Sequence, residues 1–246
     1  MKKLESYINE LKNTQNWDAF LKAESGLPGP RANLELLEAV ALTGTEETFL
    51  GYLALPPEEA PADTPEGYLR LCGVVGLGRL LREGKRQYLQ TLRGLASDEG
   101  WRVRECVAMA LQMYGEACMQ ELLEEMALWV KGNSYEKRAA AAALCEPKLL
   151  RHKEAAIQVL NLLNEITESI KNIQDRKADS FVTLKKGLAY CWSVAMVAAP
   201  GEGKQLFEKW MESGDKDIRW IIKENLKKNR LLKMDQEWTE GCIGRL

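Results

Sequence analysis

The stretch GWRVRECVAMAL, residues 100–111, sets charged side chains into a helix that otherwise looks suited to burial. Glu105 follows Trp101 by four residues, and Arg104 stands directly beside it. A carboxylate near an aromatic ring can stabilise a positive charge that develops during a reaction, whereas an arginine among small apolar residues more simply holds neighbouring segments together. Arg104 is therefore interpreted as architecture, and any enzymatic function would depend on Glu105.

Nucleophilic and metal-dependent chemistry find little support in the rest of the chain. The six cysteines lie 34, 12, 27, 46 and 51 residues apart, so no pair has the short spacing of a metal-binding motif. We interpret them as small buried side chains in a reducing compartment. The single histidine, His152, lies in EPKLLRHKE and is predicted to be a solvated surface residue. We expect no metal and no cofactor.

The charge of the chain is unevenly distributed. Its formal net charge is -2, but residues 131–246 hold 21 Lys and Arg against 16 Asp and Glu, and residues 1–130 hold 13 against 20. The basic half of the chain could face a polyanion such as DNA. A chance scatter of surface charge is the alternative interpretation.

A basic run near the C-terminus makes the polyanion hypothesis more specific. In RWIIKENLKKNRLLK, the residues Arg219, Lys223, Lys227 and Arg230 recur at intervals of 4, 4 and 3. On one continuous helix they would share a face and could meet successive phosphates. A solvated helix face is the alternative. Three nearby tryptophans are predicted to lie partly in the core and to pack there instead of stacking on bases: Trp192, Trp210 and Trp220.

These residues must be positioned by a repeated helical unit. Basic residues at 70, 104, 138, 185 and 219 are each followed by small or apolar residues three and seven positions later, and they are spaced by 34, 34, 47 and 34 residues. Segments rich in Ser, Asp and Asn precede most of these helices and can cap them. The chain has no alternating strand pattern, so it is predicted to be all-α and built from helical hairpins.

The entry patterns DEGWRVRECVAMAL and DKDIRWIIKENL resemble HEAT-type repeats. The resemblance covers about residues 28–233 and implies an α-α superhelix, a solenoid of about six HEAT-like hairpins. We expect a single domain over residues 1–246, with an N-terminal helix at 1–24, a Pro-rich loop at 55–67, longer helices in the 13 extra residues before Lys185, and a loose tail at 234–246. Tetratricopeptide repeats also have 34 residues, but their Trp, Gly and Tyr positions are not found here.

A second resemblance concerns function. The segments FVTLKKGLAYCW and DIRWIIKENLKKNRL, with the order of aromatic, acidic and basic residues before them, resemble the bacterial DNA alkylation repair family of HEAT-like glycosylases. The resemblance implies removal of N3- and N7-alkylated purines from DNA in a basic concave cleft. It places Glu105 at the catalytic carboxylate, Trp101 and Tyr190 as walls, and Arg138 as a clamp.

Three departures from that family pattern put catalysis in question. Glu105 stands where an Asp is expected, Gly100 replaces the first residue of a Trp pair, and Tyr190 replaces a later Trp. The extra methylene of Glu shifts the carboxylate by about 1 Å, and a misplacement of that size can cost on the order of a hundredfold in rate.

The sequence thus leaves three functions open. The first is a helical-repeat binding protein whose concave surface takes DNA or another polyanion; the others are an alkylpurine DNA glycosylase and a protein-interaction scaffold without a nucleic-acid role. We expect a cytoplasmic protein without a membrane partner, because the charged N-terminus MKKLESYINELKN lacks a signal sequence and no apolar run approaches 18 residues. We also expect a monomer. The predicted binding residues are Trp101, Tyr135, Arg138, Lys186, Tyr190, Arg219, Lys223, Lys227 and Arg230.

Overall fold

The computed structural model describes residues 2–245, and this part of the chain is entirely helical. It contains 15 α-helices and one short 3-10 helix, and no strand occurs among the described residues. The prediction of an all-α fold is therefore confirmed. The chain divides into two compact units, residues 1–117 and 118–246. No linker separates them, because one helix ends at Ala117 and the next begins at Met119.

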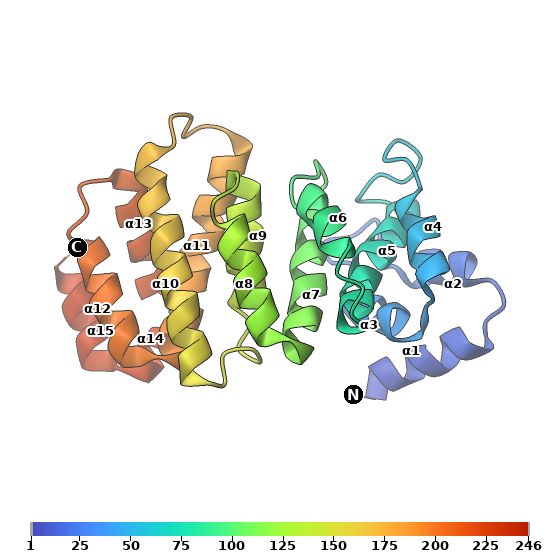
Figure 1. The fold of residues 1–246 in the computed structure, drawn as a ribbon, viewed down its shortest axis with the longest axis horizontal. Coiled ribbons are helices and arrows are strands. Elements are labelled where there is room, and N and C mark those ends of the chain that lie inside the picture. Colours follow the sequence, from blue (N-terminus) through green and yellow to red (C-terminus); the bar gives the residue numbers. More distant parts are fainter. Residues whose placement is uncertain (1, 246) are drawn as a thin grey trace. The chain divides into compact units, whose positions relative to one another are not determined.

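The first unit is built around one long helix, α5 (Figure 1). Helices α2, α3, α4, α6 and α7 all pack against α5. The bounds of the seven helices are α1 Lys2–Asn13, α2 Trp17–Glu24, α3 Leu34–Thr43, α4 Glu46–Leu53, α5 Pro65–Arg82, α6 Tyr88–Leu95 and α7 Trp101–Ala117.

Local sequence explains where α5 begins and how closely its neighbours approach. The Thr64 side chain caps the helix by accepting from the Gly67 backbone N–H, and Pro65 occupies a first-turn position that needs no hydrogen-bond donor. A Cβ added at Gly78 would lie 2.5 Å from the Ala110 carbonyl oxygen of α7, and one added at Gly76 would lie 2.3 Å from the Phe49 ring of α4. The absence of a side chain at these two glycines therefore lets α4 and α7 pack tightly on α5.

The second unit has two layers of helices (Figure 1). In one layer, called here the inner layer, α9, α11 and α13 pack in that order; in the outer layer, α8, α10 and α12 do the same. Helices α14 and α15 complete the unit. The bounds are α8 Met119–Trp129, α9 Ser134–Leu144, α10 Lys153–Ser169, η1 Ile170–Asn172, α11 Asp179–Ala198, α12 Pro200–Met211, α13 Lys216–Leu226, α14 Asn229–Met234 and α15 Gln236–Gly244.

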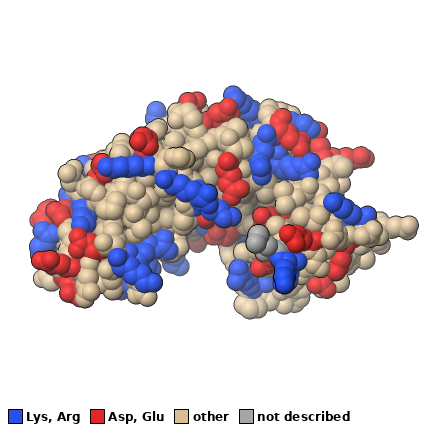
Figure 2. Space-filling view, turned by 90° about the horizontal axis from the view of Figure 1, so that it is seen from below, with Lys and Arg blue, Asp and Glu red and all other residues tan. Residues whose placement is uncertain are grey.

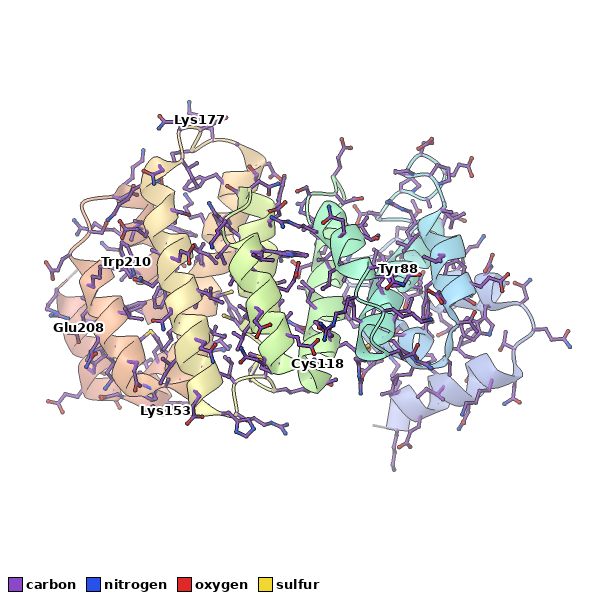
Figure 3. The ribbon with its side chains drawn as sticks, viewed as in Figure 1. Tyr88, Cys118, Lys153, Lys177, Glu208 and Trp210 are labelled. Carbon is purple, nitrogen blue, oxygen red and sulfur yellow. The ribbon has the colours of Figure 1, made fainter. Side chains whose placement is uncertain are left out.

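Large aromatic side chains form much of the core of the second unit. Trp192 of α11 is fully buried, and its indole N–H donates to the Thr167 hydroxyl of α10 at 3.0 Å. Trp210 of α12 is buried as well and donates to the Asn164 side chain of α10 at 3.1 Å; it points toward α10 in Figure 3. Both tryptophans lie in the core, as the sequence predicted.

Two helices of the second unit begin at capping residues that the sequence predicted. Asn133 caps α9 and Asp215 caps α13 through their side-chain oxygens. The extra residues before Lys185 go partly into helix, because α10 has 17 residues where α8 has 11. The predicted loop at 55–67 is correct up to Thr64, and its last three residues form the first turn of α5.

The two ends of the chain differ from the sequence prediction. The expected N-terminal helix at 1–24 is two helices, because Asn16 caps a new helix by accepting from the Ala19 N–H. The expected loose tail at 234–246 contains the ordered helix α15. Asp235 caps α15 and pairs with Lys204 of α12, and the Trp238 indole donates to Glu208 at 2.5 Å. Glu208 lies on the α12 surface in Figure 3.

Candidate nucleic-acid interface

The basic residue that recurs in the sequence is structural in the first unit. Arg70 of α5 is buried and forms an ion pair of 3.2 Å with Asp98, in the loop that precedes α7. Arg104 of α7 is also buried, and it donates to the backbone carbonyls of Asp98 at 2.6 Å and Glu99 at 2.9 Å. Both arginines therefore hold the entry loop of α7 in place, which is the architectural role predicted for Arg104.

The same arrangement recurs in the second unit. Lys185 of α11 pairs at 3.0 Å with Asp217 in the first turn of α13. Arg176, which precedes α11, pairs with Asp217 at 3.0 Å and with Asp215 at 2.9 Å. Although burial opposes ionisation, the hydrogen bond from Arg176 and two backbone N–H groups hold the pKa of Asp215 below its usual value. A basic residue on one inner helix thus anchors the entry of the next.

Trp101 and Glu105 lie on α7, in the first unit. Glu105 is exposed, and the Trp101 side chain is 47% exposed. The guanidinium of Arg102 lies 4.3 Å from the centre of the Trp101 ring. Arg102 is itself held by Asp63 at 2.6 Å and by the Gly29 carbonyl at 2.7 Å, so one face of the indole is already covered by a fixed cation. The predicted catalytic carboxylate is accessible, and its neighbouring ring is partly occupied.

The other predicted site residues lie in the second unit. Arg138 of α9 packs over Gly187 of α11, because a Cβ added there would meet the Arg138 side chain at 3.3 Å. This contact places Arg138 next to Lys186, whose side chain is exposed. Tyr135 donates its hydroxyl hydrogen to Asp179 at 2.6 Å, which ties the starts of α9 and α11 together. The predicted binding residues Tyr135, Arg138 and Lys186 therefore come from adjacent helices of the inner layer.

Tyr190 and Arg230 form a second polar pair on this layer. The Arg230 guanidinium lies 4.6 Å from the centre of the Tyr190 ring and donates to its hydroxyl at 2.6 Å. Tyr190 remains 47% exposed. The pair joins α11 to α14 and presents an aromatic ring together with a positive charge to solvent.

The basic run at 219–233 does not form the single helical face that the sequence predicted. Helix α13 ends at Leu226, Lys227 is its C-terminal cap, and Arg230 lies on the separate helix α14. Only Arg219 and Lys223 share one exposed face of α13. The chain turns at Lys228 because the backbone there becomes extended, so the four basic residues reach the surface from two helices and the turn between them.

Trp220 lies partly at the surface. It was expected to lie partly in the core, and 37% of it is exposed, on the polar side of α13 beside Arg219 and Lys223. The ammonium of Lys185 lies 5.0 Å from the centre of its ring. Helical periodicity could have predicted this exposure. Trp220 is four residues after Lys216 and three before Lys223, so it lies on the charged face of the helix.

A hydrogen-bonded asparagine fixes the register between these helices. Asn225 of α13 is fully buried, accepts from the Ser193 N–H at 2.9 Å, and donates to the Leu188 carbonyl at 2.9 Å. It thereby clamps α13 against α11 at the level of Tyr190. Because both helices pack against the outer layer, their exposed faces point away from it. We call this region the basic surface: its exposed residues are Lys186, Tyr190, Arg219, Trp220, Lys223 and Lys227, and its half-buried residues are Arg138 and Arg230.

Positive charge dominates the C-terminal part of the basic surface. Residues 216–233 contain seven Lys and Arg against two acids, Asp217 and Glu224. Asp217 is buried and already paired, and Glu224 pairs with Lys227 at 2.5 Å. Within residues 2–245, no carboxylate oxygen lies within 4.0 Å of the amine or guanidinium nitrogens of Lys186, Arg219 or Lys223. Figure 2 shows a group of Lys and Arg side chains on this unit, at the lower left.

The remaining candidate chemistry is limited. In the described part of the chain, no three His, Cys, Asp or Glu side chains are grouped so that they could hold a metal ion. His152 is exposed, as predicted, and five of the six cysteines are buried. Burial raises the pKa of the Cys72 thiol, and burial together with the nearby Cys191 raises that of Cys145, so neither is an activated nucleophile.

Comparison with known proteins identifies no relative. No family model matches the chain, and no curated protein is similar to it. One solved structure, described as an engineered protein, matches 95% of this chain and 98% of its own length, with 15% identity and a TM-score of 0.37. That level of similarity carries no argument about fold or function. None of the described helices combines the length and apolar character needed to cross a bilayer.

Proposed function

We propose that the protein is a HEAT-like α-α superhelix that binds DNA or another polyanion through the basic surface of its second unit. The observation that carries the proposal is the set of exposed cations without acidic partners on α11 and α13. Of the recurrent basic residues, Arg70, Arg104 and Lys185 make internal contacts. Lys186, Arg219 and Lys223 lie outside those contacts and face solvent. Cations held on rigid helices at one-turn spacing suit a phosphate backbone.

The exposed aromatic rings support the same ligand. Tyr190 and Trp220 are each flanked by a cation, Arg230 and Lys185 respectively. A surface that alternates positive charge with aromatic rings can contact phosphates and stack on unpaired bases. A protein partner of the scaffold type would more often cover an apolar patch, and the basic surface is mainly charged.

The direct test is fluorescence-anisotropy binding of labelled duplex and single-stranded DNA to the purified protein. The variant Arg219→Gln/Lys223→Gln removes two charges from the basic surface, and we expect it to weaken binding by about tenfold or more at low salt. The matched control is Lys153→Gln/Lys209→Gln, which removes two charges from α10 and α12 of the outer layer; Lys153 is labelled in Figure 3. Equal losses in both variants would contradict the proposed surface.

A glycosylase is the second candidate, because Trp101 and Glu105 are both exposed on α7 at the spacing that the family resemblance requires. Its test is the release of free base from duplex DNA that carries N7-methylguanine. A glycosylase predicts base release that Glu105→Gln abolishes while DNA binding is retained. Release that persists in Glu105→Gln, or no release by the unmodified protein, would remove this candidate and leave the binding function.

A further inference from the structure

The first unit contains a cleft far from the basic surface in sequence, between the start of α2 and the side of α4. Its volume is about 760 Å³, and both polar and aromatic side chains line it. The lining residues are Gln15, Asn16, Trp17, Asp18, Thr48, Gly51, Tyr52 and Leu55. Nothing in the proposed function uses this cleft.

An unneutralised carboxylate lies in the cleft. The Tyr52 hydroxyl donates to Asp18 Oδ1 at 2.8 Å, which orients the carboxylate and leaves the Oδ2 atom available. Among residues 2–245, no Lys or Arg nitrogen lies within 4.0 Å of Asp18, and the neighbouring Lys22 is directed to Glu66 instead. Burial and the hydrogen bond to Asp18 raise the pKa of Tyr52, so its hydroxyl stays a donor at neutral pH.

The aromatic rings and the local charge favour the same class of ligand. Trp17 and Tyr52 line the cleft beside Asp18, and the Trp17 indole N–H is used by the Leu11 carbonyl at 2.9 Å, which fixes the ring. An aromatic face attracts a cation, and a carboxylate alongside strengthens that attraction. Residues 1–60 hold ten acids against five Lys and Arg, so this part of the chain attracts positive charge over a longer range.

We propose that this cleft binds an arginine or lysine side chain of a basic segment in a partner polypeptide. The Asp18 carboxylate would take the cationic group, and the Trp17 ring would contact its aliphatic stem and its charge. Tyr52 is buried and would hold the carboxylate in place through its hydroxyl. The amide and hydroxyl groups of Gln15 and Thr48 lie on the same lining and match the hydrogen-bonding groups of a peptide backbone. The volume of the cleft exceeds that of a single ammonium ion, which favours the side chain of a polypeptide over a small free cation as the ligand.

The test measures the anisotropy of a fluorescein-labelled peptide of four Gly-Arg repeats with the whole protein. We expect Asp18→Asn to weaken binding by about tenfold. Gly51→Leu should abolish it, because a Cβ at this helical position meets nothing within 4 Å and the larger side chain would project into the cleft without strain. The control Glu38→Gln removes one exposed acid from α3 of the same unit and should change the affinity less than twofold. Thermal melts verify that each variant is folded.

Three results would overturn the proposal. One is equal weakening by Asp18→Asn and Glu38→Gln, which would reduce the binding to general electrostatic attraction. Another is full binding by a folded Gly51→Leu protein, which would place the peptide elsewhere. A third is binding of argininamide as tight as that of the peptide, which would make the cleft a site for small cations. The basic-surface variant Arg219→Gln/Lys223→Gln should leave peptide binding undiminished.

Discussion

The ion pair between Arg70 and Asp98 gives the most specific prediction about how α5 and the loop before α7 are held together. The Arg70 side chain is 8% exposed and that of Asp98 16%, so the pair is largely removed from water. Asp98 also accepts from the Gly100 N–H at 2.8 Å, whereas the Nε atom of Arg70 is buried without a hydrogen-bond partner in the described residues. Arg70 therefore depends on Asp98 more than Asp98 depends on Arg70.

Asp98→Asn keeps the volume of the side chain and removes its charge. The Asn oxygen can still accept from Gly100, which leaves an amide donor facing the Arg70 guanidinium. Breaking a buried pair by removing one partner costs about 3 to 5 kcal/mol, and the residual exposure of Asp98 reduces our expectation to about 2 to 3 kcal/mol. The free energy of unfolding is measured by urea denaturation followed by circular dichroism, with Arg70→Met and the double variant completing a double-mutant cycle.

The exposed pair Arg79 and Glu83 on the same helix provides the control. Their side chains are 34% and 42% exposed at a separation of 2.9 Å, and Glu83→Gln should cost about 0.5 kcal/mol or less. If Asp98→Asn costs no more than Glu83→Gln, or if Arg70→Met destabilises the protein more than Asp98→Asn does, the reasoning that Arg70 is a buried cation anchored by Asp98 is refuted.

Three further predictions concern the second unit and the cysteines. The pKa of Asp215 in the folded protein lies below its ordinary value of 3.8, so its ionised carboxylate stabilises the fold above pH 3.8, and this stabilisation is lost as the pH falls through the folded-state pKa. Asp215→Asn should therefore flatten the acid side of a curve of stability against pH. An unchanged acid side would contradict the pairing with Arg176. Trp192→Ala should cost about 3 to 5 kcal/mol and Trp220→Ala under about 1 kcal/mol by urea denaturation, and similar costs would show that the burial of the two is wrongly assigned. Cys118 is half-buried, whereas the other five thiols are buried. The fastest phase of thiol modification by Ellman's reagent at neutral pH should therefore disappear in Cys118→Ser. Persistence of that phase would mean that one of the buried thiols is accessible.

Local chemistry allowed much of the helical pattern to be predicted. Asn133 and Asp215 cap helices where the sequence placed helix starts, because a side-chain oxygen satisfies first-turn N–H groups wherever the chain can turn. The structural use of Arg104 also follows from a charged residue among small apolar neighbours. These features depend on a few adjacent residues, which is why they can be read without the tertiary structure.

The sequence-based predictions were wrong where contacts between residues far apart in the chain determine the structure. The tail after Lys233 contains Gly and lacks a clear repeat pattern, but the partners Lys204 and Glu208 on α12 hold α15 in place. The regular spacing of the basic run suggested one helix, whereas the chain turns after Leu226. The cleft beside Asp18 was missed because its residues come from two helices about thirty positions apart, and no local motif links Trp17 to Tyr52.

The central claim is that exposed cations on α11 and α13 bind a phosphate backbone, and the salt dependence of DNA binding tests it most directly. Each phosphate contact contributes about 0.9 to the slope of log K against log salt concentration. We predict that Arg219→Gln/Lys223→Gln lowers the magnitude of this slope by about 1.8 relative to the unmodified protein, while Lys153→Gln/Lys209→Gln leaves it unchanged. A slope that is the same in all three proteins, or no binding at low salt, would contradict the claim.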